Sequence, residues 1–324
     1  MFRSFFLTKK WIYWSWCGVL LILFGTGYQV YIDVKINDWF GTFYNIIQSA
    51  LAKPGSTDIK SYIHALFELG GLAMTFVIVA VFLNFFSKHW VFRWREAMND
   101  FYIFHWKDLR NIEGASQRVQ EDTKRFATIV ETLGANIVES VMTLFAFLPI
   151  LWVLSENITF IPIIGYFDHA LVYLSIIFAL FGTVLLALVG IHLPGLEFNN
   201  QKVEAAYRKE LVYAEDDDRR GEEKVLKNLF YELKKNYFRL FFHYLYFDLA
   251  RYSYLQLGVV VPYLILGPTI VSGVITLGLI QQIVRAFERI LGSFQFLVKN
   301  WPTIVELISV YKRLSAFEKA LRYR

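Results

Sequence analysis

Six apolar runs, each about 20 residues long, constrain the fold of this chain more than any other feature. They occupy residues 11–32, 65–86, 135–154, 170–191, 246–266 and 275–296. An α-helix needs about 20 mostly apolar residues to cross the hydrocarbon core of a bilayer, whereas a barrel strand needs only about ten. The runs therefore predict an all-α integral membrane protein with six transmembrane helices, and they exclude a soluble enzyme.

The composition supports a membrane protein and gives no sign of a bound cofactor. Of the 324 residues, 56% are hydrophobic and 18% are aromatic, which is more than a typical soluble domain carries. The single cysteine, Cys17, allows no disulfide framework or metal cluster, and the six histidines show no metal-ligand spacing. We therefore expect no metal and no cofactor. The first run is too long for a cleaved signal peptide and is expected to be the first transmembrane helix.

The basic residues indicate the orientation of the chain. Lys and Arg are concentrated in residues 87–134, in 192–245 and in the tail after 296, whereas the loops 155–169 and 267–273 contain none. Cytoplasmic segments of membrane proteins carry such an excess. Both termini are therefore predicted to be cytoplasmic, and this bias explains the net charge of +5 better than nucleic-acid binding does.

The lengths of the connections point to a transporter architecture. Residues 87–134 and 192–245 form two long connections whose patterns predict helices, while the outer loops are short. Helices that continue far beyond the membrane are the layout of the transmembrane half of an ABC exporter. No G-x-x-x-x-G-K-[ST] motif occurs in the 324 residues. We predict a single transmembrane transporter domain, residues 1–324, with an ABC-exporter-like fold and no nucleotide-binding domain.

Carboxylates around the third run are the first candidates for chemistry. Glu139 lies inside that run and Glu131 just before it, both among apolar neighbours. A charged side chain at the centre of a membrane helix costs roughly 2.5–3.5 kcal/mol, so such residues usually face a cavity or a partner. Glu121 is different, because Lys124 and Arg125 follow it at the spacing of a helix-surface ion pair. For Glu121 a functional role and an ordinary ion pair are equally compatible with the sequence.

A second row of carboxylates follows the fourth run. Glu204 and Glu215 are eleven residues apart, about three helical turns, and therefore share one helix face. Carboxylates clustered in a partly dry site disfavour simultaneous ionisation, which raises their affinity for protons. The row suggests a proton or cation path leading out of the membrane. An ordinary solvated helix would show the same spacing.

The last run contains three charges, Arg285, Glu288 and Arg289. They are spaced three and four residues apart and are expected to share a face. Three charges at membrane depth cannot face lipid. They are predicted to line a central aqueous cavity or to bridge two subunits, and a local ion-pair cluster is the plainer alternative. Tyr44, in the outer segment WFGTFYNIIQ, is a further candidate.

Several long motifs resemble those of the SbmA/BacA family of bacterial peptide transporters. The similarity runs in order from about Phe40 to the tail. The motifs that carry it are VFRWREAMNDFY, IEGASQRVQEDTKRFA, LPGLEFNNQKVEAAYRKELVYAEDD, KNYFRLFFHYLYFDLAR, ITLGLIQQI and VELISVYKRL. Two departures accompany it. Typical members have a further helix after the start, and the three charges of the last run do not belong to the family pattern.

The resemblance implies an inner-membrane homodimer that imports peptide antibiotics, namely microcins, proline-rich peptides and bleomycin-like compounds, using the proton gradient. It implies a proton-coupling role for a ladder of four glutamates, which match Glu121, Glu131, Glu204 and Glu215. Tyr44 and Phe147 also match positions that the family links to function.

The predicted function is therefore secondary active transport, not enzyme catalysis. The expected partners are a second copy of the chain, peptide substrates, protons and lipid, but not nucleic acid. The expected location is the bacterial inner membrane. Two alternatives remain open: a transmembrane subunit of an ABC exporter that works with a separately encoded ATPase, and a non-transporting scaffold or receptor for phage or peptide.

Overall fold

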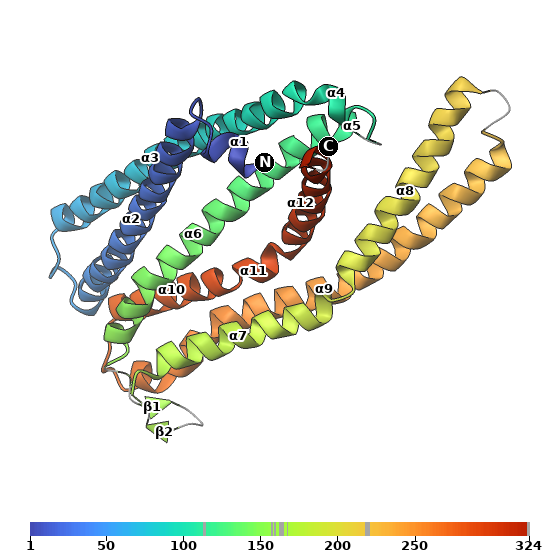
Figure 1. Ribbon diagram of the computed structural model, residues 1–324. Helices are drawn as coiled ribbons and strands as arrows, with labels where there is room; N and C mark the ends of the chain where they lie inside the picture. The colour runs from blue at the N-terminus through green and yellow to red at the C-terminus, as the bar shows by residue number, and fades with distance from the viewer. Residues whose placement is uncertain are drawn as a thin grey trace. The chain divides into compact units, whose positions relative to one another are not determined.

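Helices make up nearly all of the described chain (Figure 1). The computed structural model describes residues 1–112, 115–156, 158, 160–161, 165–166, 168–217 and 221–322. The helices are α1 (Phe2–Phe6), α2 (Ile12–Ala52), α3 (Ile59–Phe104), α4 (Trp106–Leu109), α5 (Ala115–Gln117), the π-helix η1 (Arg118–Asp122), α6 (Thr123–Leu154), α7 (Ala170–Gly190), α8 (Leu193–Asp216), α9 (Glu223–Val271), α10 (Leu277–Phe294), α11 (Phe296–Lys299) and α12 (Trp301–Arg322). Two short strands, β1 (Phe160–Ile161) and β2 (Gly165–Tyr166), pair antiparallel.

Five helical stretches in the described part are long and apolar enough to cross a membrane. They are Ile12–Ala52, Ile59–Phe104, Ala115–Leu154, Ala170–Glu215 and Glu223–Val271. They contain five of the six predicted runs, so the chain is a multi-pass helical membrane protein. The sixth run forms α10, which has only 18 residues and is interrupted by the polar side chains that follow Ile280. A membrane crossing by α10 stays a prediction.

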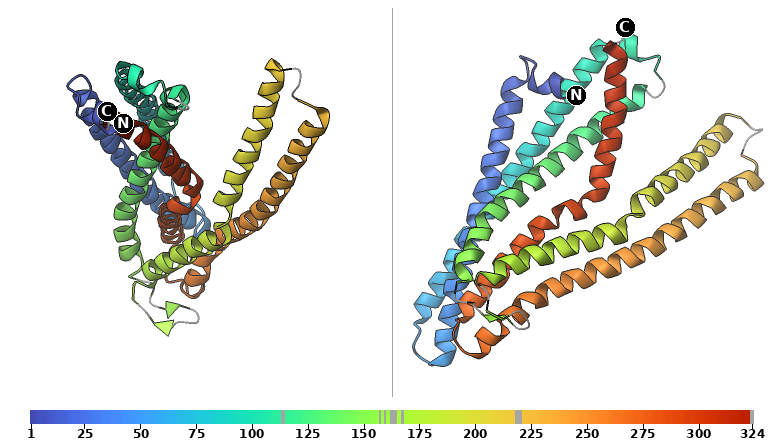
Figure 2. Two further views of the ribbon diagram at one scale, coloured as in Figure 1. Left: turned by 45° about the vertical axis from the view of Figure 1, so that its right-hand side comes forward. Right: turned by 60° about the horizontal axis from the view of Figure 1, so that its bottom comes forward.

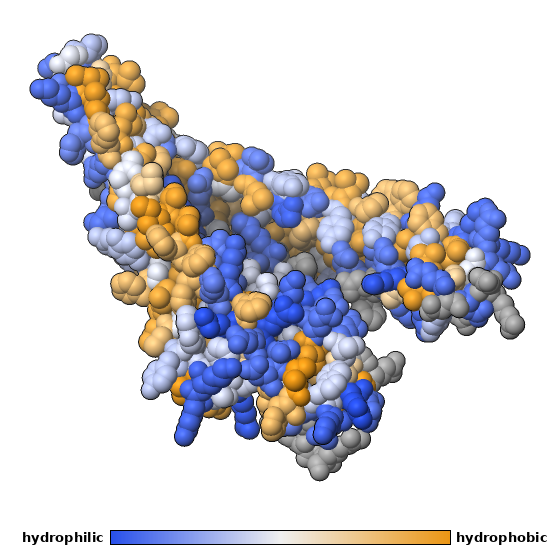
Figure 3. Space-filling model, turned by 90° about the horizontal axis from the view of Figure 1, so that it is seen from above, coloured by the Kyte–Doolittle hydropathy of each residue, from blue (hydrophilic) through white to orange (hydrophobic). Residues whose placement is uncertain are grey.

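The surface of these helices is apolar where a soluble protein would be polar. In α3, no residue of the most apolar 18-residue stretch is buried within the described chain, and Phe67, Phe82 and Phe85 are all exposed. Figure 3 shows further hydrophobic side chains at the surface, interspersed with hydrophilic ones. Apolar surface of this extent needs lipid or another apolar partner around it.

The elements form two compact units. Unit 1 contains Met1–Phe178 and Val259–Arg324, and unit 2 contains Ala179–Gly258. Each of α7 and α9 therefore contributes one end to each unit. In unit 1, α2 and α3 run side by side, and α6 packs against α2, α3, α10 and α12 (Figures 1 and 2). In unit 2, α8 lies along the first half of α9, and Leu193, Leu196 and Leu240 are buried between them.

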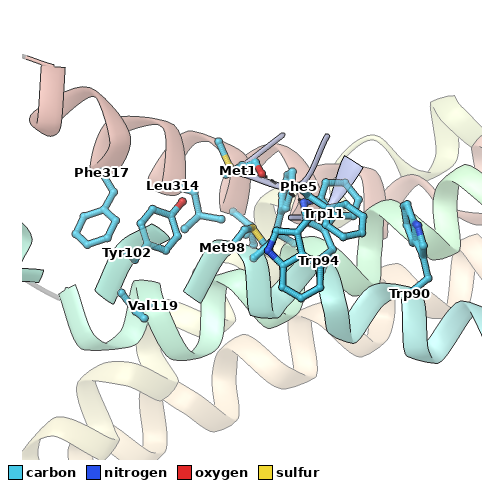
Figure 4. Close-up of a cluster of buried hydrophobic side chains, with 14 of the residues drawn as sticks. Met1, Phe5, Trp11, Trp90, Trp94, Met98, Tyr102, Val119, Leu314 and Phe317 are labelled. Atoms are coloured by element: carbon cyan, nitrogen blue, oxygen red, sulfur yellow. Dashed lines mark hydrogen bonds between the residues drawn. The ribbon is translucent and has the colours of Figure 1, made fainter. Parts of the chain in front are cut away.

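Two large hydrophobic cores lie in unit 1. One joins α1, α3, α6 and α12 and contains large side chains such as Trp94, Tyr102 and Phe317, all at most 1% exposed (Figure 4). The other joins α6 and α10 to the adjacent ends of α7 and α9, and it includes Phe147 and Phe294. These cores fix α2, α6 and α10 relative to one another.

Turn residues set the ends of the long helices. Gly55 and Gly273 have φ values of +83° and +70°, a left-handed conformation that glycine adopts without steric cost. They lie in the turns that connect α2 to α3 and α9 to α10. Pro194 lies in the first turn of α8, where its missing N–H has no intrahelical partner to lose. It separates α8 from α7.

Candidate functional site

An ion-pair cluster around a buried carboxylate joins α2 to α10. The Arg285 and Arg289 guanidinium groups both donate to Oδ1 of Asp33, at 2.6 and 2.7 Å. We call Asp33, Arg285 and Arg289 the α2–α10 cluster. The Asp33 side chain is only 10% exposed. Glu288 is exposed and, within the described chain, pairs with neither arginine. The two arginines thus form an ion-pair cluster with Asp33, and a role of Arg285, Glu288 and Arg289 in lining a cavity or bridging two subunits stays a prediction.

Aromatic rings connect this cluster to Tyr44. The guanidinium carbon of Arg285 lies 4.9 Å from the centroid of the Phe40 ring, a cation–π contact. Phe40 in turn stacks on Tyr44, with ring centroids 5.9 Å apart. Both aromatic residues are half-buried on α2. The structure therefore brings together two predicted candidates, Tyr44 and Arg285, that lie 241 positions apart in the sequence (285 − 44).

The same face of α2 continues as a polar seam against the start of α10. Oε1 of Gln48 accepts a hydrogen bond from the Leu277 N–H at 2.7 Å, and Oδ1 of Asn45 accepts one from the Gly278 N–H at 3.1 Å. The first N–H groups of a helix have no intrahelical partner, so these side chains satisfy donors that would otherwise stay unpaired. Thr276 caps the same end by accepting from the Leu279 N–H. The seam fixes the register of α10 on α2.

Glu121 lies in the π-helix η1 and forms the helix-surface ion pair that its spacing allowed. Nη2 of Arg125 donates to Glu121 Oε1 at 2.7 Å, and Gln117 donates to the other carboxylate oxygen at 3.2 Å. Arg125 also donates to Glu306 of α12 at 3.1 Å. Glu121 thus belongs to a surface network that links η1, α6 and α12, and a coupling role for it stays a prediction.

The residue next to Glu121 makes the stronger contact. Asp122 is 2% exposed and accepts from Nε and Nη2 of Arg313, at 2.9 and 2.7 Å. These hydrogen bonds, together with the Asp122 charge, raise the pKa of the Arg313 guanidinium above its ordinary value, although partial burial opposes the rise. The pair joins η1 to α12.

Replacing Arg313 by lysine is expected to lower the free energy of unfolding by about 1–2 kcal/mol. A lysine cannot reproduce the two parallel hydrogen bonds, and Asp122 would keep its charge in a buried position with a weaker partner. Thermal unfolding of the detergent-solubilised protein measures the effect. Lys312→Arg, at the exposed neighbouring position, is the control and should leave the unfolding temperature unchanged. Equal unfolding temperatures for the two variants would contradict the contribution of the pair.

Glu131 lies at an apolar cavity of about 550 Å³ in unit 1. The lining comes from α1, α2, α3 and α6 and includes Phe6, Trp16, Trp90 and Trp94, with Arg3 as the other charged residue. Figure 4 shows Trp94 of α3 next to Phe5 of α1, and the Trp90 ring centroid lies 5.3 Å from that of Trp94. Oγ1 of Thr132 donates to Glu131 at 3.3 Å. Glu131 therefore lies among apolar side chains, and a proton-coupling role for it stays a prediction.

The other candidates of α6 lie in contrasting surroundings. Glu139 is exposed, so it does not face the interior of unit 1. Phe147 is 0% exposed and packs in the second core of unit 1. This burial gives Phe147 a packing role that fully explains an aromatic side chain at this position. A direct role of either residue in cargo binding stays a prediction.

In unit 2, two glutamates of α8 bind tyrosines of α9. The Tyr237 hydroxyl donates to Glu204 at 2.9 Å, and the Tyr244 hydroxyl donates to Glu197 at 2.7 Å. The two glutamates are seven residues apart on α8, and the two tyrosines are seven residues apart on α9. The two hydrogen bonds therefore link the antiparallel helices at two successive positions, and we call them the tyrosine–glutamate rungs. Glu215 is exposed in the last turn of α8. A common path for Glu121, Glu131, Glu204 and Glu215 stays a prediction.

Long apolar helices that extend past membrane length, with ion pairs between them, define a multi-pass membrane protein. The chain belongs to the SbmA/BacA-like family, which it matches over residues 8–322. The family resemblance found in the motifs is therefore confirmed over nearly the whole chain.

Curated relatives are ABC transporter proteins. The chain is 25% identical over 321 residues to the inner membrane ABC transporter ATP-binding protein YddA of Escherichia coli (strain K12), covering 91% of this chain and 55% of that protein. It is 24% identical over 297 residues to an ABC transporter ATP-binding protein of Haemophilus influenzae, covering 86% of this chain and 49% of that protein. ABC transporter D family member 2, chloroplastic, of Arabidopsis thaliana is 24% identical over 246 residues, with 71% and 33% covered. The chain thus spans about half the length of the two bacterial relatives.

Proposed function

We propose that this chain imports peptides across the bacterial inner membrane as a homodimer that alternates between inward- and outward-open forms, driven by the proton gradient. The observation that carries the proposal is the match to the SbmA/BacA-like family over residues 8–322. Cargo class, proton coupling and dimerisation come from the resemblance of the motifs to that family. The geometry of the glutamates supplies the chemistry.

The tyrosine–glutamate rungs of unit 2 are contacts that respond to a proton. Each tyrosine hydroxyl donates to a carboxylate oxygen, at 2.9 Å for Glu204 and 2.7 Å for Glu197. A hydrogen bond to an ionised group is roughly twice as strong as a neutral one. Protonation of Glu204 therefore weakens its link to Tyr237 and with it the contact between α8 and α9. Release of the proton restores the contact.

Glu131 provides a second proton-dependent contact, in unit 1. Its carboxylate is one of two charged groups at a cavity otherwise lined mainly by apolar side chains. Neutralising Glu131 would make this lining more compatible with apolar cargo or lipid, because a charge at an apolar surface must keep its own hydration. A membrane potential of 100 mV contributes about 2.3 kcal/mol for each charge moved. A few protons per cycle are enough to bias a two-state transporter.

A second candidate is the membrane part of an ABC transporter powered by ATP hydrolysis on a separately encoded ATPase. The observation that favours it is the set of relatives, which are named as ABC transporter ATP-binding proteins and of which this chain spans about half. Transport in that case follows ATP and a partner ATPase, and it is independent of a pH gradient.

Uptake into liposomes separates the two candidates. Purified protein is expected to import a labelled proline-rich peptide when the pH is lower outside than inside, and Glu131→Gln and Glu204→Gln should each reduce this uptake at least about tenfold. The amide cannot gain and lose a proton. Glu222→Gln, at an exposed position between α8 and α9, is the matched control and should transport normally. Uptake that requires ATP and an added ATPase, and that does not respond to the pH gradient, would establish the second candidate. If neither peptide nor protons moved under either condition, both candidates would be contradicted.

A further inference from the structure

The α2–α10 cluster carries one positive charge in excess. Two guanidinium groups share a single carboxylate oxygen of Asp33, and Glu288 does not compensate, because it pairs with neither arginine in the described chain. The side chains become more exposed in the order Asp33, Arg285, Arg289, at 10%, 24% and 42%. Asp33 is therefore the buried member of the cluster, and Arg289 is the positively charged side chain that solvent or a ligand can reach most easily.

Buried polar groups next to the cluster lack partners. Arg285 Nε is buried and unpaired in the described chain, and so are both polar atoms of the Asn37 side chain, which is 0% exposed. Buried groups of this kind normally have a hydrogen-bond partner. Two of the three unpaired atoms, Arg285 Nε and Asn37 Nδ2, carry N–H donors, and the third, Asn37 Oδ1, is an acceptor. A group that accepts hydrogen bonds can therefore pair the two donors.

The position of Asn37 places it on the α2 face that meets α10. It lies one turn after Asp33, which binds Arg285 and Arg289, and one turn before Gly41, which packs against Gln282 and Gly278. Residues four apart lie on one helix face. Along α2, Asn37 therefore lies between two contacts with α10: the ion pairs of Asp33 on one side and the packing of Gly41 on the other.

We propose that the α2–α10 cluster binds a carboxylate of the cargo, specifically the C-terminal carboxylate of a transported peptide. This inference rests on the proposed peptide transport, and it states which chemical group of the cargo this site recognises. A guanidinium binds a carboxylate through two parallel hydrogen bonds, and Arg289 has N–H groups that Asp33 does not occupy. The incoming carboxylate takes Arg289, while Asp33 keeps Arg285, so the excess charge becomes zero.

The stacked rings give this site a wall. Phe40 lies under the Arg285 guanidinium and is itself stacked on Tyr44. This contact holds Arg285 in place when Arg289 changes partner, because a planar guanidinium remains stacked on the aromatic face.

The test compares two versions of one peptide. A fluorescent proline-rich peptide with a free C-terminal carboxylate, and the same peptide with a C-terminal amide, are titrated with the purified full-length protein in nanodiscs and followed by fluorescence anisotropy. The acid is expected to bind about tenfold more tightly than the amide. Arg289→Gln should bring the two affinities together by weakening binding of the acid while leaving that of the amide unchanged. Lys35→Gln, which removes the same charge from an exposed position two residues from Asp33, should keep the tenfold difference.

Several outcomes would overturn the inference. Equal affinities for acid and amide in the unaltered protein would do so, as would binding of neither peptide. If Arg289→Gln weakened binding of both peptides equally, the cluster would have a structural role. If it changed only the oligomeric state, the cluster would belong to a contact between subunits. The titration uses no gradient. Loss of proton-driven uptake with intact discrimination between acid and amide would therefore contradict the proposed coupling alone.

Discussion

Replacing Asp33 by alanine is expected to lower the free energy of unfolding by about 3–5 kcal/mol, because it removes the counter-charge of two arginines at once. Arg285 and Arg289 both donate to this one carboxylate, which is 10% exposed. Without it, two guanidinium groups face each other with no carboxylate between them. Thermal unfolding of the detergent-solubilised protein, followed by tryptophan fluorescence, should show a large fall in the unfolding temperature.

Two further variants test the cause of that loss. Asp38→Ala removes an exposed carboxylate from the same helix and should change stability by no more than about 0.5 kcal/mol. The triple variant Asp33→Ala, Arg285→Met, Arg289→Met should recover most of the stability, since an ion-pair cluster replaced as a whole by apolar side chains is often neutral. If the triple variant unfolds as early as Asp33→Ala alone, packing around Asp33 and not its charge is what stabilises α2 on α10.

The fold was largely predictable because lipid imposes a length and a composition on each span. Five of the apolar runs became helices that exceed membrane length. The run 275–296 was harder to interpret, because its average hydropathy combines a buried apolar helix face with an exposed polar one. In α10, Ile283, Phe287 and Ile290 are buried in unit 1 while Glu288 is exposed. Averaged hydropathy does not distinguish such a helix from a uniformly apolar one, whereas periodicity along the run does.

The site was predictable only where the partners are close in sequence. Arg125 follows Glu121 by four residues, and this local pair formed as its spacing allowed. The partners of Arg285 and Arg313 lie 252 and 191 positions away, so no local pattern could name Asp33 or Asp122. A weak signal did exist for Asp33, which is an isolated acidic residue at the end of the first apolar run. Burying a single carboxylate there requires a basic partner on another helix.

The tyrosine–glutamate rungs show the same limit. The spacing of Glu204 along α8 predicted a shared face, but not what that face contacts. Its partner, Tyr237, comes from α9, 33 positions later, after the chain has reversed direction. Tyrosines are common along this part of α9, so the sequence alone does not select among them. The pairing of the two antiparallel helices decides which tyrosines of α9 lie opposite a glutamate of α8.

Replacing Gly278 by alanine is expected to destabilise the protein by about 3 kcal/mol, because α10 starts in direct contact with the backbone of α2. A Cβ atom at this position would lie 1.9 Å from the carbonyl oxygen of Gly41 and 2.6 Å from Oδ1 of Asn45. A backbone oxygen cannot rotate away, so the helices must separate. Separation would also lengthen the hydrogen bond between the Gly278 N–H and Asn45.

Gly292→Ala is the matched control for this variant, since it adds the same methyl group to the same helix. A Cβ atom at Gly292 would meet nothing within 4 Å, and alanine is favoured over glycine inside a helix by about 0.5–1 kcal/mol. The two substitutions should therefore shift the unfolding temperature in opposite directions. An unchanged temperature for Gly278→Ala would mean that α10 does not lie against Gly41. The α2–α10 cluster would then lose its geometric basis as well, because the same packing holds Arg285 and Arg289 at Asp33.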